Sequence, residues 1–174
     1  MIHFLQAADI AVFNTIVYSL KNGFFDVLMP LLSDANTWRL PLLGLWIGFI
    51  ALGRKKGLKT AILCVIAVGI TDYLCGGILQ PLIHRPRPLG GVTPSFPSCH
   101  AANTFAAATV ISYVWRKQWV YACVFALAGA VAYSRVYTTS HYPSDVVAGA
   151  VIGSGIALGA SVLYERIAER IKRK

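Results

Sequence analysis

The sequence predicts an all-α fold, an integral membrane helical bundle of about five transmembrane helices preceded by short interfacial helices at the N-terminus. The chain of 174 residues is 56% hydrophobic and only 13% charged, whereas soluble domains contain about 25% charged residues. Its mean hydropathy is +0.61, long apolar stretches follow one another, and cations gather just outside them. These features argue against a soluble enzyme, a disordered tail and a small disulfide-stabilised secreted domain.

Residues 1–34 are predicted to form helices that lie in the membrane interface. Apolar residues recur at helical spacing along the first twenty positions, and polar residues such as Asp9 fall between or opposite them, as in an amphipathic helix. The apolar stretch 24–32 is too short to span a bilayer comfortably and contains Asp26 and Pro30. We therefore expect this second stretch to be half inserted.

Residues 38–164 are predicted to form the transmembrane core, because five apolar stretches follow one another there. The predicted spans are residues 38–52, 58–83, 98–115, 119–133 and 144–164. No repeat, linker or low-complexity tract divides the sequence, so we expect a single membrane-embedded domain, 1–174. A basic cytoplasmic tail, 165–174, is expected to complete it.

The net charge of +9, from 16 Lys and Arg against 7 Asp and Glu, would suggest a nucleic-acid partner in a soluble protein. Here eleven cations form three clusters just outside apolar stretches, which is typical of cytoplasmic helix ends, so no nucleic-acid partner is predicted. The clusters are Arg54, Lys55, Lys56 and Lys59; Arg116 and Lys117; and Arg166, Arg170, Lys172, Arg173 and Lys174. Loops 84–97 and 134–143 then face the opposite side, although they carry Arg85, Arg87 and Arg135. Cations that the topology does not require indicate a functional site on the non-cytoplasmic face.

These arginines belong to three local groups that together fit a phosphate site. The groups are Arg85-Pro86-Arg87-Pro88, then Pro97-Ser98-Cys99-His100, and then Ser134-Arg135 with His141 and Asp145. Arginine guanidinium groups match phosphate oxygens, and the prolines of the first group keep its backbone extended. Ser98 precedes an apolar helical stretch, so it is predicted to be an N-cap whose helix offers free N–H groups to an anion.

Two histidines and an aspartate are predicted to carry the chemistry. Asp145, four residues after His141 and in the first turn of the last span, is expected to hydrogen-bond one ring nitrogen and leave the other free as nucleophile or base. His100, in the first turn of its own helix, can give a proton to a departing oxygen. A metal site is the alternative, but these ligands among arginines suit an anion better than a cation. Asp72, within the second span, is expected to bond a neighbouring helix rather than to catalyse.

The three groups resemble the signature of the type-2 phosphatidic acid phosphatase superfamily. The third group matches that family's pattern of Ser-Arg, five residues, His, three residues and Asp in full. The second matches its Pro-Ser-Gly-His motif, with Cys99 in place of the glycine. The first, which is Lys, six residues and Arg-Pro, matches at Arg87 and Pro88, with Gln80 in place of the lysine.

The resemblance implies a helical membrane enzyme that hydrolyses phosphate esters through a phosphohistidine, without a metal or other cofactor. It implies that His141 attacks phosphorus, that Asp145 orients His141, and that His100 protonates the leaving oxygen. The implied phosphate ligands are Arg87, Arg135, Ser98, the amide of Cys99 and Gln80, with Arg85 or His84 as candidate replacements for the missing lysine charge.

The implied substrate is a phosphate monoester on the headgroup of a membrane lipid. Lipid A 1-phosphate and phosphatidylglycerophosphate are favoured, with undecaprenyl diphosphate and phosphatidic acid as alternatives. The implied location is the bacterial inner membrane, with the active site on the periplasmic face. The alternative from another class is a non-catalytic lipid-binding or flipping protein on the same scaffold, because Gln80 and Cys99 depart from the motifs.

Overall fold

The computed structural model describes residues 2–173, with side chains from residue 6 onward, and this part of the chain is helical without strands. The helical segments, including the π-helices η1 and η2, are α1 (Ile2–Asn14), η1 (Thr15–Ser19), α2 (Gly23–Ser33), α3 (Ala35–Leu52), α4 (Arg54–Asp72), η2 (Tyr73–Leu79), α5 (Gln80–Ile83), α6 (Cys99–Trp115), α7 (Gln118–Tyr137) and α8 (Pro143–Lys172). The predicted all-α architecture is confirmed.

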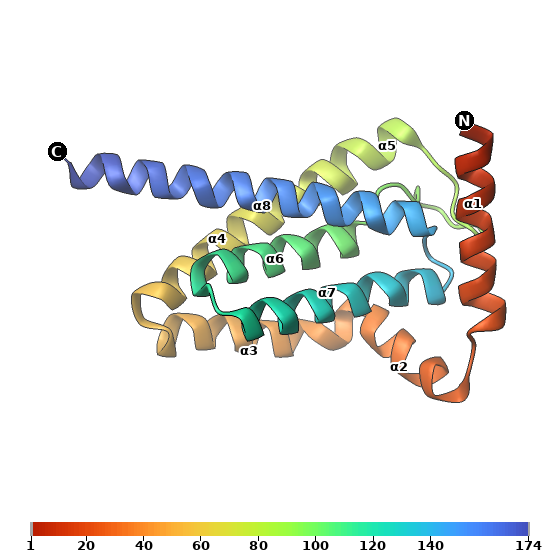
Figure 1. Ribbon diagram of the computed structural model, residues 1–174, viewed down its shortest axis with the longest axis horizontal. Helices are drawn as coiled ribbons and strands as arrows, with labels where there is room; N and C mark the ends of the chain where they lie inside the picture. The colour runs from red at the N-terminus through yellow and green to blue at the C-terminus, as the bar shows by residue number, and fades with distance from the viewer. Residues whose placement is uncertain (1, 174) are drawn as a thin grey trace.

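Five helices, of which the second is the continuous run from α4 to α5, form an elongated bundle, and α1 lies across one end of it (Figure 1). Three segments are long and apolar enough to cross a membrane, namely Arg54–Ile83, Gln118–Tyr137 and Pro143–Lys172. Helices α3 and α6 run alongside them in the same bundle (Figure 1). Helix α3 has no buried residue, and its exposed side chains are mostly apolar, as expected for a helix that faces lipid.

Helix α6 lies at the centre of the bundle and packs against α4, α7 and α8. Its buried face is rich in alanine, and it meets two glycines of α8. A Cβ atom added to Gly153 would lie 2.0 Å from the carbonyl oxygen of Ala102, and one added to Gly149 would lie 2.5 Å from that of Ser98. Small residues on both helices thus allow the two backbones to approach closely, which places the starts of α6 and α8 side by side.

The stretches predicted to span the membrane are helical, and several of the helices are longer than predicted. Residues 38–52 and 119–133 lie within the longer helices α3 and α7. The predicted tail, 165–174, is a continuation of α8 through Lys172 rather than a separate segment. Its Glu and Arg residues favour helix, and Glu165 forms an ion pair with Lys59 of α4. The three cation clusters lie at the end of the bundle opposite α1, where the α3–α4 and α6–α7 connections and the C-terminal part of α8 meet (Figure 1).

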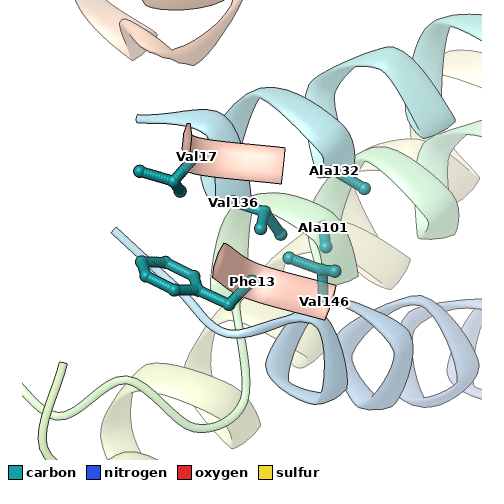
Figure 2. Close-up of a cluster of buried hydrophobic side chains, with 6 residues drawn as sticks. All are labelled: Phe13, Val17, Ala101, Ala132, Val136 and Val146. Atoms are coloured by element: carbon teal, nitrogen blue, oxygen red, sulfur yellow. The ribbon is translucent and has the colours of Figure 1, made fainter. Parts of the chain in front are cut away.

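Helix α1 and η1 pack on the bundle along one narrow stripe of side chains. Phe13 of α1 and Val17 of η1 are buried, and they join a cluster with residues of α6, α7 and α8, which are Ala101, Ala132, Val136 and Val146 (Figure 2). Asp9, one of the polar residues that fall between or opposite the apolar ones, is only 8% exposed. The side of α1 that carries it faces the bundle. The placement of residues 1–34 in the membrane interface stays a prediction.

Helix α2 begins at an N-cap, where the Oδ1 atom of Asn22 accepts a hydrogen bond from the backbone N–H of Phe25 at 3.0 Å. Such a side-chain acceptor stabilises the first turn of a helix. The helix packs against α7 and buries Met29 and Ser33. This contact brings Ser33 next to Arg135 of α7.

We predict that Gly153→Ala lowers the free energy of unfolding by about 1–3 kcal/mol, because its methyl group meets backbone rather than a movable side chain. Gly155→Ala on the same helix is the matched control, since nothing lies within 4 Å of a Cβ at that position. The measurement is the melting temperature of the two detergent-solubilised variants. Equal melting temperatures would show that the contact between α6 and α8 has room for a methyl group at position 153.

Candidate active site

Two loops bring the three predicted groups together at the end of the bundle that α1 crosses. Loop 84–98 joins α5 to α6, and loop 138–142 joins α7 to α8 (Figure 1). A backbone hydrogen bond ties the end of the first loop to α8, since the N–H of Ser98 donates to the carbonyl oxygen of Asp145 at 3.0 Å. Residues separated by nearly fifty positions thus share one site.

His141 is held by a backbone carbonyl rather than by the predicted aspartate. Its side chain is 2% exposed, and its Nδ1 atom lies 2.7 Å from the carbonyl oxygen of Ser95. Because a carbonyl can only accept, this contact assigns the proton to Nδ1 and leaves Nε2 with a free lone pair. The Oδ2 atom of Asp145 lies 3.8 Å from Nδ1, which is too far for a hydrogen bond. Asp145 therefore acts on His141 through its charge.

Asp145 is fully buried and hydrogen-bonded on both oxygens. Its Oδ1 atom accepts from Nη1 of Arg85 at 2.6 Å, and its Oδ2 atom accepts from the backbone N–H of Tyr142 at 2.9 Å. A buried carboxylate with these partners is kept in its ionised form and in one orientation. The carboxylate thus presents a fixed negative charge to the histidine ring.

Arg87 and Arg135 supply the positive charge expected of a phosphate site. Arg87 is fixed to its own loop and to the next one, since it donates to the carbonyl oxygen of Thr93 at 3.0 Å, to the hydroxyl of Thr93 at 2.9 Å and to the carbonyl oxygen of Ser140 at 3.3 Å. Arg135 donates through Nη1 to the carbonyl oxygen of Ser33 at 2.9 Å and to its hydroxyl. The buried Nε atom of Arg135 has no hydrogen-bond partner among residues 2–173. A buried N–H without an acceptor suits an anionic ligand.

The start of α6 follows the prediction for an N-cap. Ser98 is fully buried, and its hydroxyl accepts a long hydrogen bond of 3.5 Å from the N–H of Ala101. The helix begins at Cys99 and places the half-buried His100 in its first turn. Backbone N–H groups of the first turn and the helix dipole both favour an anion there.

Gln80 and Cys99, the two departures from the family motifs, contact each other. The Nε2 atom of Gln80 donates to the carbonyl oxygen of Pro97 at 3.0 Å and to Sγ of Cys99 at 3.3 Å. A Cβ atom on Gly76 would lie 3.5 Å from the same sulfur, which is an ordinary van der Waals distance, so the thiol packs beside this glycine. Gln80 braces the loop before α6. It brings no charge to the site.

Arg85 and His84 do not occupy the place of the missing lysine. Arg85 donates to Asp145, to the hydroxyl of Ser144 at 2.7 Å and, through Nη2, to Asp9 at 2.6 Å. Its guanidinium carbon also lies 4.2 Å from the centre of the Tyr142 ring. His84 is exposed and adopts a left-handed backbone conformation with φ of 52°. The structure thus makes Arg85 a partner of carboxylates rather than a free ligand for phosphate.

Sequence reasoning missed Ser95 and Asp9. Ser95 acts through its carbonyl oxygen, which every residue type carries, so no local signal could have marked it. Asp9 lies more than seventy positions from its partner Arg85, and its spacing along α1 suggested only a polar face. The prediction for Asp72 agrees with the structure, since its Oδ1 atom accepts from Nδ2 of Asn103 on α6 at 2.7 Å.

An open pocket of about 400 Å³ adjoins Arg87 between the two loops. Residues 89–93 form one wall, and Thr138, Thr139 and Ser140 form the other. Polar and apolar groups contribute about equally to these walls, since Leu89 and Val92 lie among the backbone and hydroxyl groups. Among the described residues, no group of three or more His, Cys, Asp or Glu side chains is arranged to hold a metal ion.

The pKa of His141 lies below its usual value of 6.5. Burial is the main cause, and the cations Arg135 and Arg87 act in the same direction, while Asp145 and the Ser95 carbonyl oppose them. The imidazole is therefore neutral at pH 7. In a neutral ring with the proton on Nδ1, the Nε2 atom carries the lone pair and can act as the nucleophile.

Comparison with known proteins places this site in a family. The family model described as the PAP2 superfamily matches residues 59–169, which is more than half of the chain, so the chain belongs to the PAP2 superfamily. Two solved structures share the fold. One is a transmembrane PAP2-type phosphatidylglycerolphosphate phosphatase from Bacillus subtilis, with a TM-score of 0.75 and 24% identity, covering 94% of this chain and 87% of that chain. The other is LpxE from Aquifex aeolicus, with a TM-score of 0.67 and 26% identity, covering 87% of this chain and 93% of that chain. The fold is thus that of an integral membrane protein, as the sequence predicted.

Curated relatives include phosphatases with different lipid names. A lipid A 4′-phosphatase of Bacteroides thetaiotaomicron is 36% identical over 115 residues, which cover 55% of this chain and 51% of that protein. Phosphatidylglycerophosphatase B of Bacillus subtilis is 29% identical over 186 residues, which cover 97% of this chain and 87% of that protein. The chain thus spans about half the length of the first relative and most of the second.

We predict that His141 titrates below pH 6.5 and that Asp145→Asn lowers this pKa further, because the substitution removes the nearby negative charge that favours the imidazolium. Histidine ¹⁵N NMR on detergent-solubilised protein, with His141→Ala to assign the signal, reports both the pKa and the tautomer. A neutral form protonated on Nε2 would contradict the contact with Ser95, and a pKa above 6.5 would contradict the dominant effect of burial.

Proposed function

We propose that the chain is a membrane lipid phosphatase that hydrolyses a phosphate monoester through a phosphohistidine at His141. The observation that carries this proposal is the hydrogen bond from Nδ1 to the Ser95 carbonyl, which leaves the Nε2 lone pair available in a site with two arginines. A mere anion-binding site has no need of a buried neutral histidine fixed in its nucleophilic tautomer. Membership of a family with relatives named as phosphatases also supports the proposal.

In the first step, Nε2 of His141 forms a bond to phosphorus as the bond between phosphorus and the lipid oxygen breaks. His100 gives its proton to that oxygen, so the lipid leaves as an alcohol. The anionic phosphate favours the protonated form of His100 before this step. Arg87 and Arg135, with the N–H groups at the start of α6, stabilise the charge on the phosphoryl oxygens.

In the second step, water attacks the phosphohistidine and gives a proton to His100. The bond between nitrogen and phosphorus breaks, inorganic phosphate leaves, and both histidines return to their starting states. Asp145 stabilises the positive charge that develops on the His141 ring during attack, because its carboxylate lies 3.8 Å from Nδ1. No metal ion or other cofactor takes part in either step.

The proposed substrate is a lipid of the inner membrane, with lipid A phosphate and phosphatidylglycerophosphate as the leading candidates. The site lies at one end of the bundle, where a lipid headgroup can reach it from the membrane surface, and the cation clusters lie at the other end (Figure 1). Cation-rich helix ends are typical of the cytoplasmic side, which supports a periplasmic active site. The open pocket beside Arg87 has room for the headgroup beyond the phosphate.

We predict that His141→Ala abolishes phosphate release, with a loss of at least about 10³-fold, because no other group supplies the nucleophile. His100→Ala should lose about 10²- to 10⁴-fold as a general acid. His84→Ala is the matched control, because that histidine is exposed and outside the site, and it should keep full activity. Phosphate release from a panel of the candidate lipids by purified protein is the measurement.

Activity in the His141→Ala variant would overturn the histidine mechanism. Silence of the folded wild-type protein across the lipid panel would instead favour a non-catalytic lipid-binding protein.

We also predict that EDTA leaves activity unchanged and that vanadate inhibits competitively, because vanadate mimics phosphate at the Arg87 and Arg135 site. The measurement is phosphate release with each reagent across a range of lipid concentrations. Loss of activity in EDTA that Mg²⁺ or Zn²⁺ restores would reveal a metal requirement and contradict the proposed chemistry.

A further inference from the structure

We propose that Asp9 of α1 is a positioning residue for His141, acting through Arg85 and Asp145. This inference rests on the proposed function and assigns a role in it to the N-terminal helix. Asp9, Arg85 and Asp145 form a continuous chain of ion pairs that ends 3.8 Å from the His141 ring. The chain crosses from α1, through loop 84–98, to the first turn of α8.

Three short hydrogen bonds engage Asp9, which is 8% exposed. Its Oδ2 atom accepts from Nη2 of Arg85 at 2.6 Å and from the hydroxyl of Ser144 at 2.6 Å. Its Oδ1 atom accepts from the backbone N–H of Ser144 at 2.8 Å. The last contact satisfies one of the free N–H groups at the start of α8, where a negative charge is favourable. Asp9 therefore fixes the turn that carries Asp145.

Arg85 links the two carboxylates. One end of its guanidinium group binds Asp9, the other end binds Asp145, and its face lies over the ring of Tyr142. A half-buried cation held between two anions has one orientation, and the loss of one anion frees that end to move. Asp145 would then keep its partner but lose the geometry that sets its distance from His141.

An apolar contact holds α1 in the position that this chain of ion pairs requires. Phe13, one helical turn after Asp9, packs with Val17 of η1 against residues of α6, α7 and α8 (Figure 2). Phe13 also lies 5.5 Å from the Tyr142 ring, centre to centre. The apolar cluster sets the position of the helix, and the carboxylate acts on the site. These two roles can be separated by mutation.

The charged and titratable groups around His141 come from several elements at this end of the bundle. They are Asp9 on α1, Arg85 and Arg87 on loop 84–98, His100 on α6, Arg135 on α7 and Asp145 on α8. Loss of the Asp9 charge leaves the cations less compensated, which disfavours the imidazolium form of His141. The acid limb of the activity profile should therefore move to lower pH in an Asp9 variant.

The test compares Asp9→Asn with Phe13→Ala and Asp26→Asn. Asn at position 9 keeps the shape of the side chain but places an N–H₂ donor against the donors of Arg85 or Ser144. We expect kcat to fall about 10-fold with KM within about 2-fold of wild type, since a small misplacement of a catalytic group costs up to about 10²-fold. The acid limb should move down in the same variant.

The two controls separate charge from helix docking. Phe13→Ala weakens the docking of α1 but keeps the Asp9 charge near Arg85, so the acid limb should move less than in Asp9→Asn. Asp26→Asn makes the same chemical change at a carboxylate of α2. This carboxylate accepts from the hydroxyl of Tyr137 at 2.8 Å and does not belong to the chain of ion pairs. It should leave the acid limb in place. Equal behaviour of Asp9→Asn and Phe13→Ala would reduce α1 to a structural cover and overturn the proposal.

A second variant and a second readout keep the test independent of folding and of turnover. Ser144 is exposed, and its hydroxyl hydrogen-bonds both Asp9 and Arg85. Ser144→Ala removes this hydroxyl and should lower kcat about 3-fold. Histidine NMR should show a lower His141 pKa in Asp9→Asn even if no lipid is hydrolysed. Unchanged His141 titration in both variants overturns the positioning role, whereas absent turnover with a shifted titration overturns only the proposed function.

Discussion

The close approach of α6 and α8 is the constraint on which the rest of the site depends. Gly149 and Gly153 leave no side chain between α8 and the backbone of α6, so the first turns of both helices begin side by side. The N–H of Ser98 can then donate to the carbonyl oxygen of Asp145. This single backbone contact ties the motif at the start of α6 to the motif at the start of α8. A wider helix pair would separate His100 from His141 without changing either motif.

Electrostatics then divide the arginines at this end of the bundle into two kinds. Arg85 is neutralised by two buried aspartates and stacks on Tyr142, so it organises the protein. Arg87 and Arg135 bond to carbonyl and hydroxyl groups, which orient a guanidinium without cancelling its charge. Their positive charge therefore remains available to an anion. Sequence alone gives Arg85 and Arg87 the same Arg-Pro context, and only the contacts distinguish them.

Much of the fold and most of the site could be predicted because they depend on patterns within short segments. Apolar stretches predicted the five helices, and the spacing of His141 and Asp145 predicted their neighbourhood. The remaining features depend on contacts between distant segments. The carbonyl oxygen of Ser95, rather than Asp145, accepts the hydrogen bond from His141. Gln80 contacts Cys99, and Asp9 of α1 binds Arg85, which lies 76 positions later in the sequence. Backbone acceptors and pairings of this range leave no periodic or local signal in one sequence.

The neutral brace formed by Gln80 and Cys99 limits the charge that the site presents to a substrate. Arg85, Arg87 and Arg135 stand against Asp9 and Asp145, which leaves a net charge of +1 around a neutral His141, or +2 when His100 carries the proton that it donates. A lysine in place of Gln80 would raise this charge by one. Under the proposed mechanism, a phosphate monoester dianion enters a site that nearly compensates it, whereas a diphosphate brings additional charge with no cation to meet it. Gln80 supplies no cation for that additional charge, because its Nε2 atom donates to the carbonyl oxygen of Pro97 and to Sγ of Cys99.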